Sequence, residues 1–466
     1  MARPSRYKDD AERVEARRVK TREYVRAHRA RRKHAPAVKS GGDVSSPDEF
    51  MPLIKRETPS TTDSDSLAKT PRLSPSLDVL HGTPEERRSF HYFRQIVIPH
   101  MAGYIKTDFW LRVIPQASHE EPAIQHSIAA FASLHEGLAY NRPTEGPART
   151  WTMYGLSQYC KAMKSLTELD ARSEGSRLDV ILACCTLFVC IELLLGNHET
   201  ALLHIDRGID IMNQTSETDK QREFKYVAHA DLWNLMRRLD TSAALWYRTR
   251  VPRLQEQWNV SSLCPGYFTD LESALQPVCK MFHRLLLTGR TTTADKPSVH
   301  TIYPDDCESM RLSQLVDQYE IALNTSLDKG YLPQSALPGV ILLRTFIAWL
   351  RLTANCTDPA MCVHQSQKIL AYVQILLDGF DKAKGSSQTP RMWSPFTLDV
   401  GVLGPLCSVF LLSQDLSVKT EALNLMAPCL AQQEGFLRAK VVWEDLKAQL
   451  NQAFVSVDDQ TATTSR

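Results

Sequence analysis

Basic residues are concentrated at the start of the chain, at a density that can bind phosphates or acidic protein grooves. Residues 1–40 contain fourteen Lys and Arg against five Asp and Glu, a net charge of +9. The whole chain carries +2, so residues 41–466 carry a net charge of −7. The candidate residues for such contacts are Arg17, Arg18, Lys20, Arg22, Arg26, Arg29, Arg31, Arg32 and Lys33.

The spacing of these cations fits two functions. Arg17-Arg18, a spacer of ten residues and the cluster Arg29–Lys33 have the layout of a bipartite nuclear localisation signal, which predicts a nuclear protein bound by an import receptor. The same side chains could follow the phosphates of duplex DNA, giving salt-dependent affinity without sequence choice. A solvated arm with neither role is the third interpretation. No heptad of leucines follows, which excludes a leucine-zipper basic region.

Catalytic and metal-binding patterns are missing from the sequence. There is no G-x-S-x-G, P-loop or G-x-G-x-x-G motif, and no C-x2-C pair. The pairs His119/His126 and His198/His204 do not have H-E-x-x-H spacing. We therefore expect no catalytic residue, no metal ligand and no cofactor. An all-α enzyme without a recognisable motif is the least favoured class of function.

The cysteines indicate a reducing compartment. All eleven lie at or after Cys160, and no secretory signal precedes them. Cys184, Cys185 and Cys190 fall within the apolar run Val180–Ile191, which is twelve residues long. A membrane span needs about twenty residues. The run is expected to be a buried core helix, and no membrane association is predicted.

Composition divides the chain into four parts. Residues 1–40 are the basic arm, within which residues 8–34 are rich in helix-forming residues. Residues 41–84 are rich in Ser, Thr and Pro, which predicts a disordered linker. Residues 85–455 form the body, and residues 456–466 are expected to be a frayed tail.

The body has the apolar periodicity of helices. Ile124, Ile128 and Phe131 fall at positions i, i+4 and i+7, and similar stripes follow further along the chain. Gly196 separates two such segments in the manner of a helical hairpin. Residues 291–305 and 383–395 are expected to be loops. The predicted fold is all-α, a body of helical hairpins preceded by the basic arm and the disordered linker.

Several short motifs of the body resemble one known family. They are Ser89–Phe93 (SFHYF), Thr107–Trp110 (TDFW), Gln116–Ile124 (QASHEEPAI), Leu134–Glu136 (LHE) and Arg238–Asp240 (RLD). This succession is similar to the regulatory domain of fungal-specific transcription factors, the region that follows a Zn2Cys6 cluster in those proteins. The likeness extends over roughly residues 85–450.

The resemblance implies a helical regulatory domain in a nuclear regulator of transcription. It implies core positions for Phe93, Phe109 and Trp110, and a structural polar network around Asp240 and Arg238. A Zn2Cys6 cluster would place six cysteines in the first few dozen residues, whereas no cysteine precedes Cys160.

The expected partners follow from this combination. They are DNA through the basic arm, a nuclear import receptor, and protein partners or a second copy of the chain. The alternative is a co-regulator that keeps the regulatory fold, pairs with a zinc-cluster protein and does not bind DNA directly.

Overall fold

The computed structural model describes most of the body. The described residues are 82–139, 147–172, 177–214, 225–247, 250–255, 264–288, 290–291, 302–303, 306–354, 359–383 and 395–464. The basic arm, with all nine candidate residues, and residues 41–81 of the linker lie outside them.

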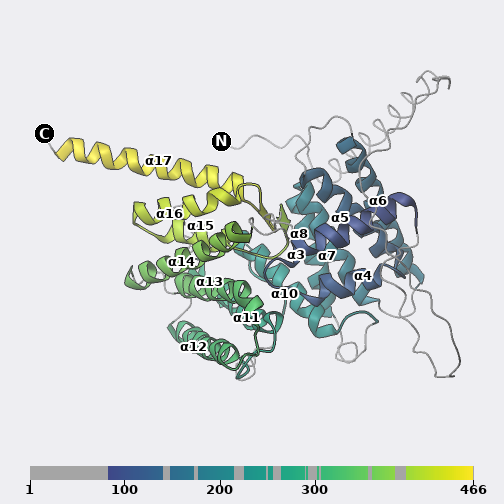
Figure 1. Cartoon of the computed structure of the whole chain (residues 1–466), viewed down its shortest axis with the longest axis horizontal. Coiled ribbons are helices and arrows are strands. Elements are labelled where there is room, and N and C mark those ends of the chain that lie inside the picture. Colours follow the sequence, from purple (N-terminus) through teal and green to yellow (C-terminus); the bar gives the residue numbers. More distant parts are fainter. Residues whose placement is uncertain are drawn as a thin grey trace, which may run out of the picture. The chain divides into compact units, whose positions relative to one another are not determined.

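Helices dominate the described residues, which confirms the all-α prediction (Figure 1). The α-helices are α2 (Pro84–Tyr92), α3 (Ile98–Ala102), α4 (Ile114–Ala117), α5 (Pro122–Ala139), α6 (Pro147–Arg172), α7 (Leu178–Leu195), α8 (His198–Gln214), α10 (His229–Trp246), α11 (Leu271–Thr288), α12 (Asp306–Asp328), α13 (Leu337–Ala354), α14 (Pro359–Ala383), α15 (Leu403–Leu412), α16 (Leu416–Met426) and α17 (Ala439–Thr464). Short π and 3₁₀ segments are η1 (Phe93–Val97), η2 (Phe109–Val113), η4 (Gln334–Ala336) and η5 (Ala427–Cys429).

Consecutive helices pack against each other as hairpins. The pairs α5 with α6, α7 with α8, α13 with α14 and α15 with α16 are all in contact. Gly196 ends α7 with a φ of +79°, the left-handed conformation that glycine adopts without strain. The amide of Asn197 then donates to the carbonyl of Glu192 at 2.8 Å, which closes the turn into α8.

The body begins slightly before its predicted start. Thr83 caps α2: its hydroxyl accepts from the Glu86 amide at 3.2 Å, and its own amide donates to the Glu86 carboxylate at 3.0 Å. Pro84 occupies the first helical turn, where its missing N–H costs nothing. The last two residues assigned to the linker therefore belong to the helix start.

Two hydrophobic cores lie inside the body. The first is built mainly by α2 to α10 and contains the buried Phe93, Trp110 and Phe131. The second is built mainly by α11 to α17 and contains Tyr319 and Trp349. The side chain of Trp246, at the end of α10, packs against both.

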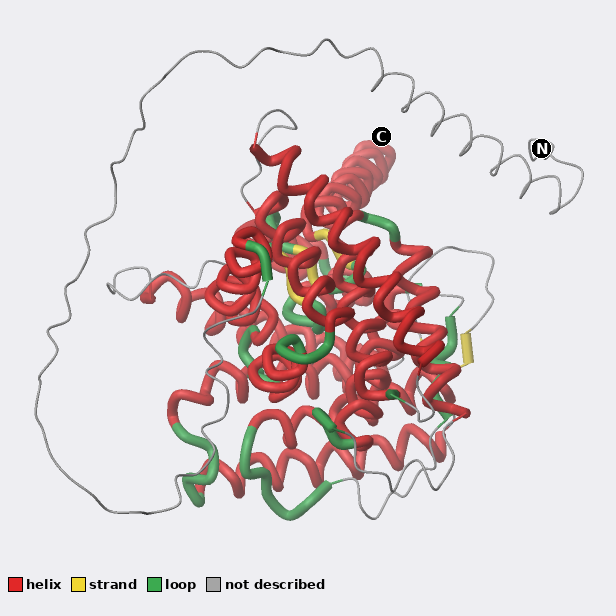
Figure 2. Tube along the Cα trace, turned by 90° about the vertical axis from the view of Figure 1, so that its right-hand side faces the viewer, coloured by secondary structure: helices red, strands yellow, loops and turns green. Residues whose placement is uncertain are grey.

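A small sheet contributes to both cores. Strands β3 (Phe396–Thr397), β4 (Gln433–Glu434) and β5 (Leu437–Arg438) lie in that order, with β4 parallel to β3 and antiparallel to β5. Figure 2 draws the strands in yellow among the red helices. Phe396 and Phe436 belong to the first core, and Leu437 belongs to the second. Because its residues reach both cores, the sheet connects them.

A second strand pair lies in a segment that we expected to be a loop. Strands β1 (Arg290–Thr291) and β2 (Ile302–Tyr303) are antiparallel, so the two ends of the 291–305 segment pair with each other. Their extended form was not evident because each strand has only two residues. The 384–394 part of the other predicted loop lies outside the described residues.

The apolar run forms the core helix expected for it. Helix α7 extends beyond the run at both ends. It includes Asp179 and Glu192, whose carboxylates accept hydrogen bonds inside the fold. Helix α7 and the segment Gln334–Ala354 are long and apolar enough to cross a membrane, but they are 89% and 67% buried within the fold. Packing thus accounts for their composition. At the other end, α17 continues to Thr464 and so includes residues 456–464.

Candidate functional site

The polar network predicted around the Arg238–Asp240 triplet falls within the described residues. Both Arg238 and Asp240 lie on α10 and are buried, as the predicted structural network requires. They do not pair with each other, however. Asp240 binds the segment 250–255, whereas Arg238 faces Asp399 at 3.5 Å. Among the described residues, no group of three His, Cys, Asp or Glu side chains could hold a metal ion.

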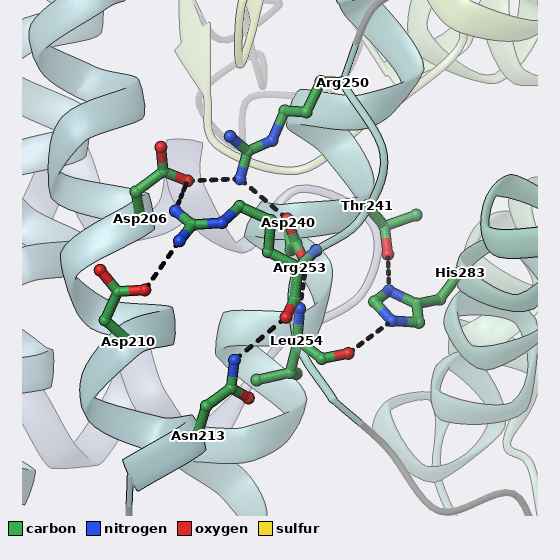
Figure 3. A network of polar contacts seen from close by, with 9 residues as sticks. All are labelled: Asp206, Asp210, Asn213, Asp240, Thr241, Arg250, Arg253, Leu254 and His283. Carbon is green, nitrogen blue, oxygen red and sulfur yellow. Dashed lines mark hydrogen bonds and ion pairs between the residues drawn. The ribbon is translucent and has the colours of Figure 1, made fainter.

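Asp240 anchors the segment that follows α10 (Figure 3). One carboxylate oxygen accepts from the Arg250 guanidinium at 2.9 Å. The other accepts from the backbone amides of Arg253 and Leu254 at 2.6 and 2.8 Å. With an exposed fraction of 0%, this carboxylate depends entirely on these donors to replace water. Its role is therefore structural.

The same segment is tied to α8 and α11. Asp206 forms ion pairs with Arg250 at 2.8 Å and with Arg253 at 3.0 Å. Burial alone would raise the pKa of Asp206, but the two guanidinium groups outweigh it and lower that pKa. On the other side, the ring of the buried His283 contacts the Leu254 carbonyl through Nε2 at 3.2 Å, so Nε2 carries the proton. The network thus fixes 250–255 between helices of the two cores.

A cavity of about 960 Å³ lies where the two cores meet. Its walls include Met101 and Leu239 of the first core, and Phe282, Phe346 and Trp349 of the second. Most of the lining is apolar, and the volume is within the range that holds a drug-sized molecule. Exposed residues of the lining include the large apolar side chains Ile96, Leu337 and Ile375.

A few polar side chains converge on this cavity. Arg238 is 8% exposed, and its Nε and Nη1 atoms have no hydrogen-bond partner among the described residues; the contact of Nε with Asp399 is an ion pair at 3.5 Å. Ser242, one turn further along α10, is 6% exposed and its hydroxyl also has no hydrogen-bond partner there. Tyr104 also lines the cavity, and burial raises the pKa of its phenol, which therefore keeps its proton. These groups give the cavity hydrogen-bond donors within an apolar surface.

The carboxylate of Glu434 lines the cavity but is already engaged. Its oxygens accept from the amides of Gly401, Val402 and Leu403 at 2.8, 3.0 and 3.2 Å. These amides stand at the start of α15, where N–H groups lack intrahelical partners. Burial raises the pKa of Glu434 to about 7, against the effect of the three amides. Glu434 therefore caps α15 and offers little to a ligand.

Sequence reasoning did not find the cavity. Its lining comes from residues 95–105, 238–245, 275–282, 337–349, 375–379, 397–402 and 432–434. Each contribution is a few side chains of an ordinary helix or loop, without a motif of its own. The buried Arg238 was the available signal, because arginine is rarely placed in an apolar stripe without a partner.

Comparison with known proteins identifies the first part of the body. Residues 88–263 match the sequence model of the fungal specific transcription factor domain. That region is therefore similar to the fungal specific transcription factor domain. The match confirms the resemblance found in the motifs, and it covers a narrower region than residues 85–450.

Two curated relatives are regulators of transcription. The transcription regulator lscL of Purpureocillium lilacinum is 30% identical over 108 residues, which are 22% of this chain and 26% of the relative. The aspercryptin biosynthesis cluster-specific transcription regulator atnN of Emericella nidulans is 28% identical over 166 residues, 34% of this chain and 25% of the relative. The matched segments thus span about a quarter of each relative's length. No solved structure matches the chain significantly.

The region that matches the fungal specific transcription factor domain supplies one side of the cavity. Gln95–Ile105 and the α10 residues Arg238–Leu245 lie inside the matched region 88–263. The remaining walls, from Leu275 to Glu434, lie beyond it. The cavity therefore depends on packing between the matched domain and the helices that follow.

Proposed function

We propose that this chain is a nuclear regulator of transcription in which the basic arm makes the DNA contacts and the helical body is the regulatory domain. The observation that carries the proposal is the fungal specific transcription factor domain at residues 88–263, together with two relatives that are transcription regulators. The net charge of +9 in residues 1–40 supports an electrostatic contact with phosphates. No cysteine precedes Cys160 in this sequence, so in this proposal the phosphate contacts are assigned to the arm.

DNA binding by the arm is tested by fluorescence anisotropy with a labelled random duplex over a series of salt concentrations. The full chain is compared with residues 41–466, and with a full-length variant in which Arg29, Arg31, Arg32 and Lys33 are replaced by glutamine. Each phosphate contact should contribute about 0.9 to the slope of log affinity against log salt. We expect a steep slope for the full chain, a slope lower by up to roughly 3.6 for the glutamine variant, and no binding by residues 41–466 near physiological salt.

Failure of the full chain to bind under these conditions would rule out direct DNA contact by the arm. The favoured function would then be the co-regulator, which pairs with a zinc-cluster protein and uses the arm for import alone. A slope that survives truncation would instead place the phosphate contacts in the body and contradict the assignment to the arm.

Nuclear import is tested separately with a fluorescent fusion in a fungal cell. A bipartite signal needs both clusters. Replacing Arg17 and Arg18 by alanine, or Arg29–Lys33 by alanines, should each leave the fusion distributed throughout the cell. Nuclear accumulation of both variants would show that these cations are not an import signal.

A further inference from the structure

We infer that the cavity between the two cores is a binding site for an uncharged, mostly apolar small molecule that carries a carbonyl-type hydrogen-bond acceptor. This inference does not depend on DNA binding by the arm. It rests on the size and lining of the cavity, on two lining side chains, Arg238 and Ser242, that have donor atoms without a hydrogen-bond partner among the described residues, and on the charges that surround them.

The shape of the cavity favours a small molecule over a peptide or a protein surface. Its volume of about 960 Å³ lies near the upper end of the range for small-molecule sites. Three aromatic side chains, Phe282, Phe346 and Trp349, form one continuous wall: the ring centroids of Phe282 and Trp349 are 4.7 Å apart, and those of Phe346 and Trp349 are 6.4 Å apart. A flat apolar ring system packed on this wall would gain van der Waals contacts that the aromatic side chains lack while the cavity is empty.

The polar part of the site consists of donors. Arg238 and Ser242 are both more than nine-tenths buried, and both line the cavity. Nε and Nη1 of Arg238 and Oγ of Ser242 form no hydrogen bond among the described residues. Leaving such groups without an acceptor is costly, and each N–H of a guanidinium can only donate. The ligand group that satisfies them is an acceptor, such as a ketone, lactone, ester or amide carbonyl.

The neighbouring charges argue against an anionic ligand. Arg238 already faces the carboxylate of Asp399, and Glu434 lines the same cavity. Glu272 also lies within electrostatic range of Arg238. Burial raises the pKa of Glu272, and the charge of Arg238 acts in the opposite direction. A ligand carboxylate would be a further anion beside the single arginine of the lining. A neutral carbonyl can accept from Nη1 of Arg238 and from Oγ of Ser242 without adding to this repulsion.

The binding test uses Nile red, an uncharged fused-ring dye with a single ring carbonyl and a fluorescence that increases in apolar surroundings. The full-length protein is titrated with the dye, and 1-anilinonaphthalene-8-sulfonate serves as the anionic counterpart. We expect saturable binding of Nile red at one site per chain. The sulfonate dye should compete at least about tenfold more weakly.

Two tryptophan variants distinguish the cavity from general surface binding. Ile341 of α13 lines the cavity and is half-buried, so Ile341→Trp should fill part of it. Ile321 of α12 is 66% exposed and does not line the cavity, so Ile321→Trp is the matched control. Ile341→Trp should weaken Nile red binding at least about tenfold, and Ile321→Trp should leave it within about twofold. Equal dye binding by both variants would overturn the assignment of the site.

Two polar variants test how the carbonyl is recognised. Arg238→Lys keeps a positive charge beside Asp399 but loses the planar pair of donors, and should weaken Nile red binding about tenfold. Ser242→Ala removes an unsatisfied hydroxyl, and should weaken binding a few-fold without lowering thermal stability. If neither variant changes the affinity for Nile red, Arg238 and Ser242 do not recognise the carbonyl. If the sulfonate dye binds more tightly than Nile red through Arg238, the inference that the ligand is uncharged is wrong. Ser242→Ala keeps the test decisive if Arg238→Lys does not fold.

Discussion

At the scale of single residues, the buried carboxylate of Asp240 holds the segment 250–255 against α10. Three donors from the segment 250–255 converge on it, and no water can replace them because the side chain is fully buried. Asp240→Asn keeps the shape but removes the charge and turns one acceptor into a donor facing Arg250. We expect the free energy of unfolding to fall by about 3 kcal/mol, measured by urea denaturation.

Asp210→Asn is the matched control for that change. Asp210 belongs to the same network through its ion pair with Arg253 at 2.8 Å, but the two side chains are 33% and 45% exposed. Solvent can replace this pair, so the loss should be no more than about 0.5–1 kcal/mol. Similar losses for the two variants would contradict the view that burial, and not the number of charges, makes Asp240 important.

His135 makes stability depend on pH. It is 1% exposed on α5, and its two ring nitrogens face the Tyr92 hydroxyl at 3.3 Å and the His100 ring at 3.4 Å. Burial, with a smaller effect of His100, lowers the pKa of His135 from 6.5 to about 3. Below pH 6.5 the unfolded chain takes up a proton that the folded chain does not, so stability is lost as the pH falls toward 3.

The expected size of this effect follows from the same shift. Between pH 7.5 and 5.5 the wild-type protein should lose about 1.4 kcal/mol more unfolding free energy than His135→Gln. The measurement is urea denaturation at both pH values. His91→Gln, which changes an exposed histidine of α2, should behave as the wild type does. An identical pH dependence in the wild type and His135→Gln would show that His135 is not the source.

At the scale of elements, the helices could be predicted from sequence and the sheet could not. The stripe Ile124, Ile128 and Phe131 marks α5 because helical packing repeats every few residues and leaves a long signal. Strands β3 to β5 have two residues each, which is too short for an alternating pattern to appear. They are held by contacts distant in sequence, such as the bond from Gln433 Nε2 to the Leu193 carbonyl at the end of α7. The cavity was missed for the same reason.

Two helical glycines show how one residue type can have opposite roles in similar elements. A Cβ at Gly379 in α14 would have no atom within 4 Å, whereas one at Gly339 in α13 would lie 2.4 Å from Leu271 Cδ1 and 3.1 Å from the Tyr104 carbonyl oxygen. Gly379→Ala should therefore raise the unfolding free energy by about 0.5–1 kcal/mol, because alanine favours the helix. Gly339→Ala should lower it by about 1–3 kcal/mol, because the added carbon overpacks the contact with α11. Thermal denaturation of both variants measures the difference, and a change of the same sign in both would contradict the packing argument.

At the scale of the whole body, the β3–β4–β5 sheet links the stability of the two cores. Gly435 makes the turn between β4 and β5 with a φ of +54°, and its amide donates to the Thr397 carbonyl at 2.7 Å. On its C-terminal side, Phe436 enters the first core and Leu437 enters the second. A disturbance of this turn should therefore reach α10 and α15 together, although they belong to different cores.

Gly435→Ala tests this coupling by hydrogen exchange. An added Cβ would lie 3.1 Å from the Leu398 carbonyl oxygen and 3.3 Å from Ser242 Oγ, in addition to the strain of the left-handed conformation. We expect the free energy of unfolding to fall by about 1–2 kcal/mol, with faster amide exchange in α7 and α10 as well as in α13 and α15.

Gly330→Ala is the control, because Gly330 has a φ of +70° and a Cβ added there would have no atom within 4 Å, so strain alone acts. Its effect should stay near the end of α12. If Gly435→Ala accelerates exchange in one core alone, the two cores are independent folding units, and a ligand in the cavity between them could stabilise only the core whose donors it binds.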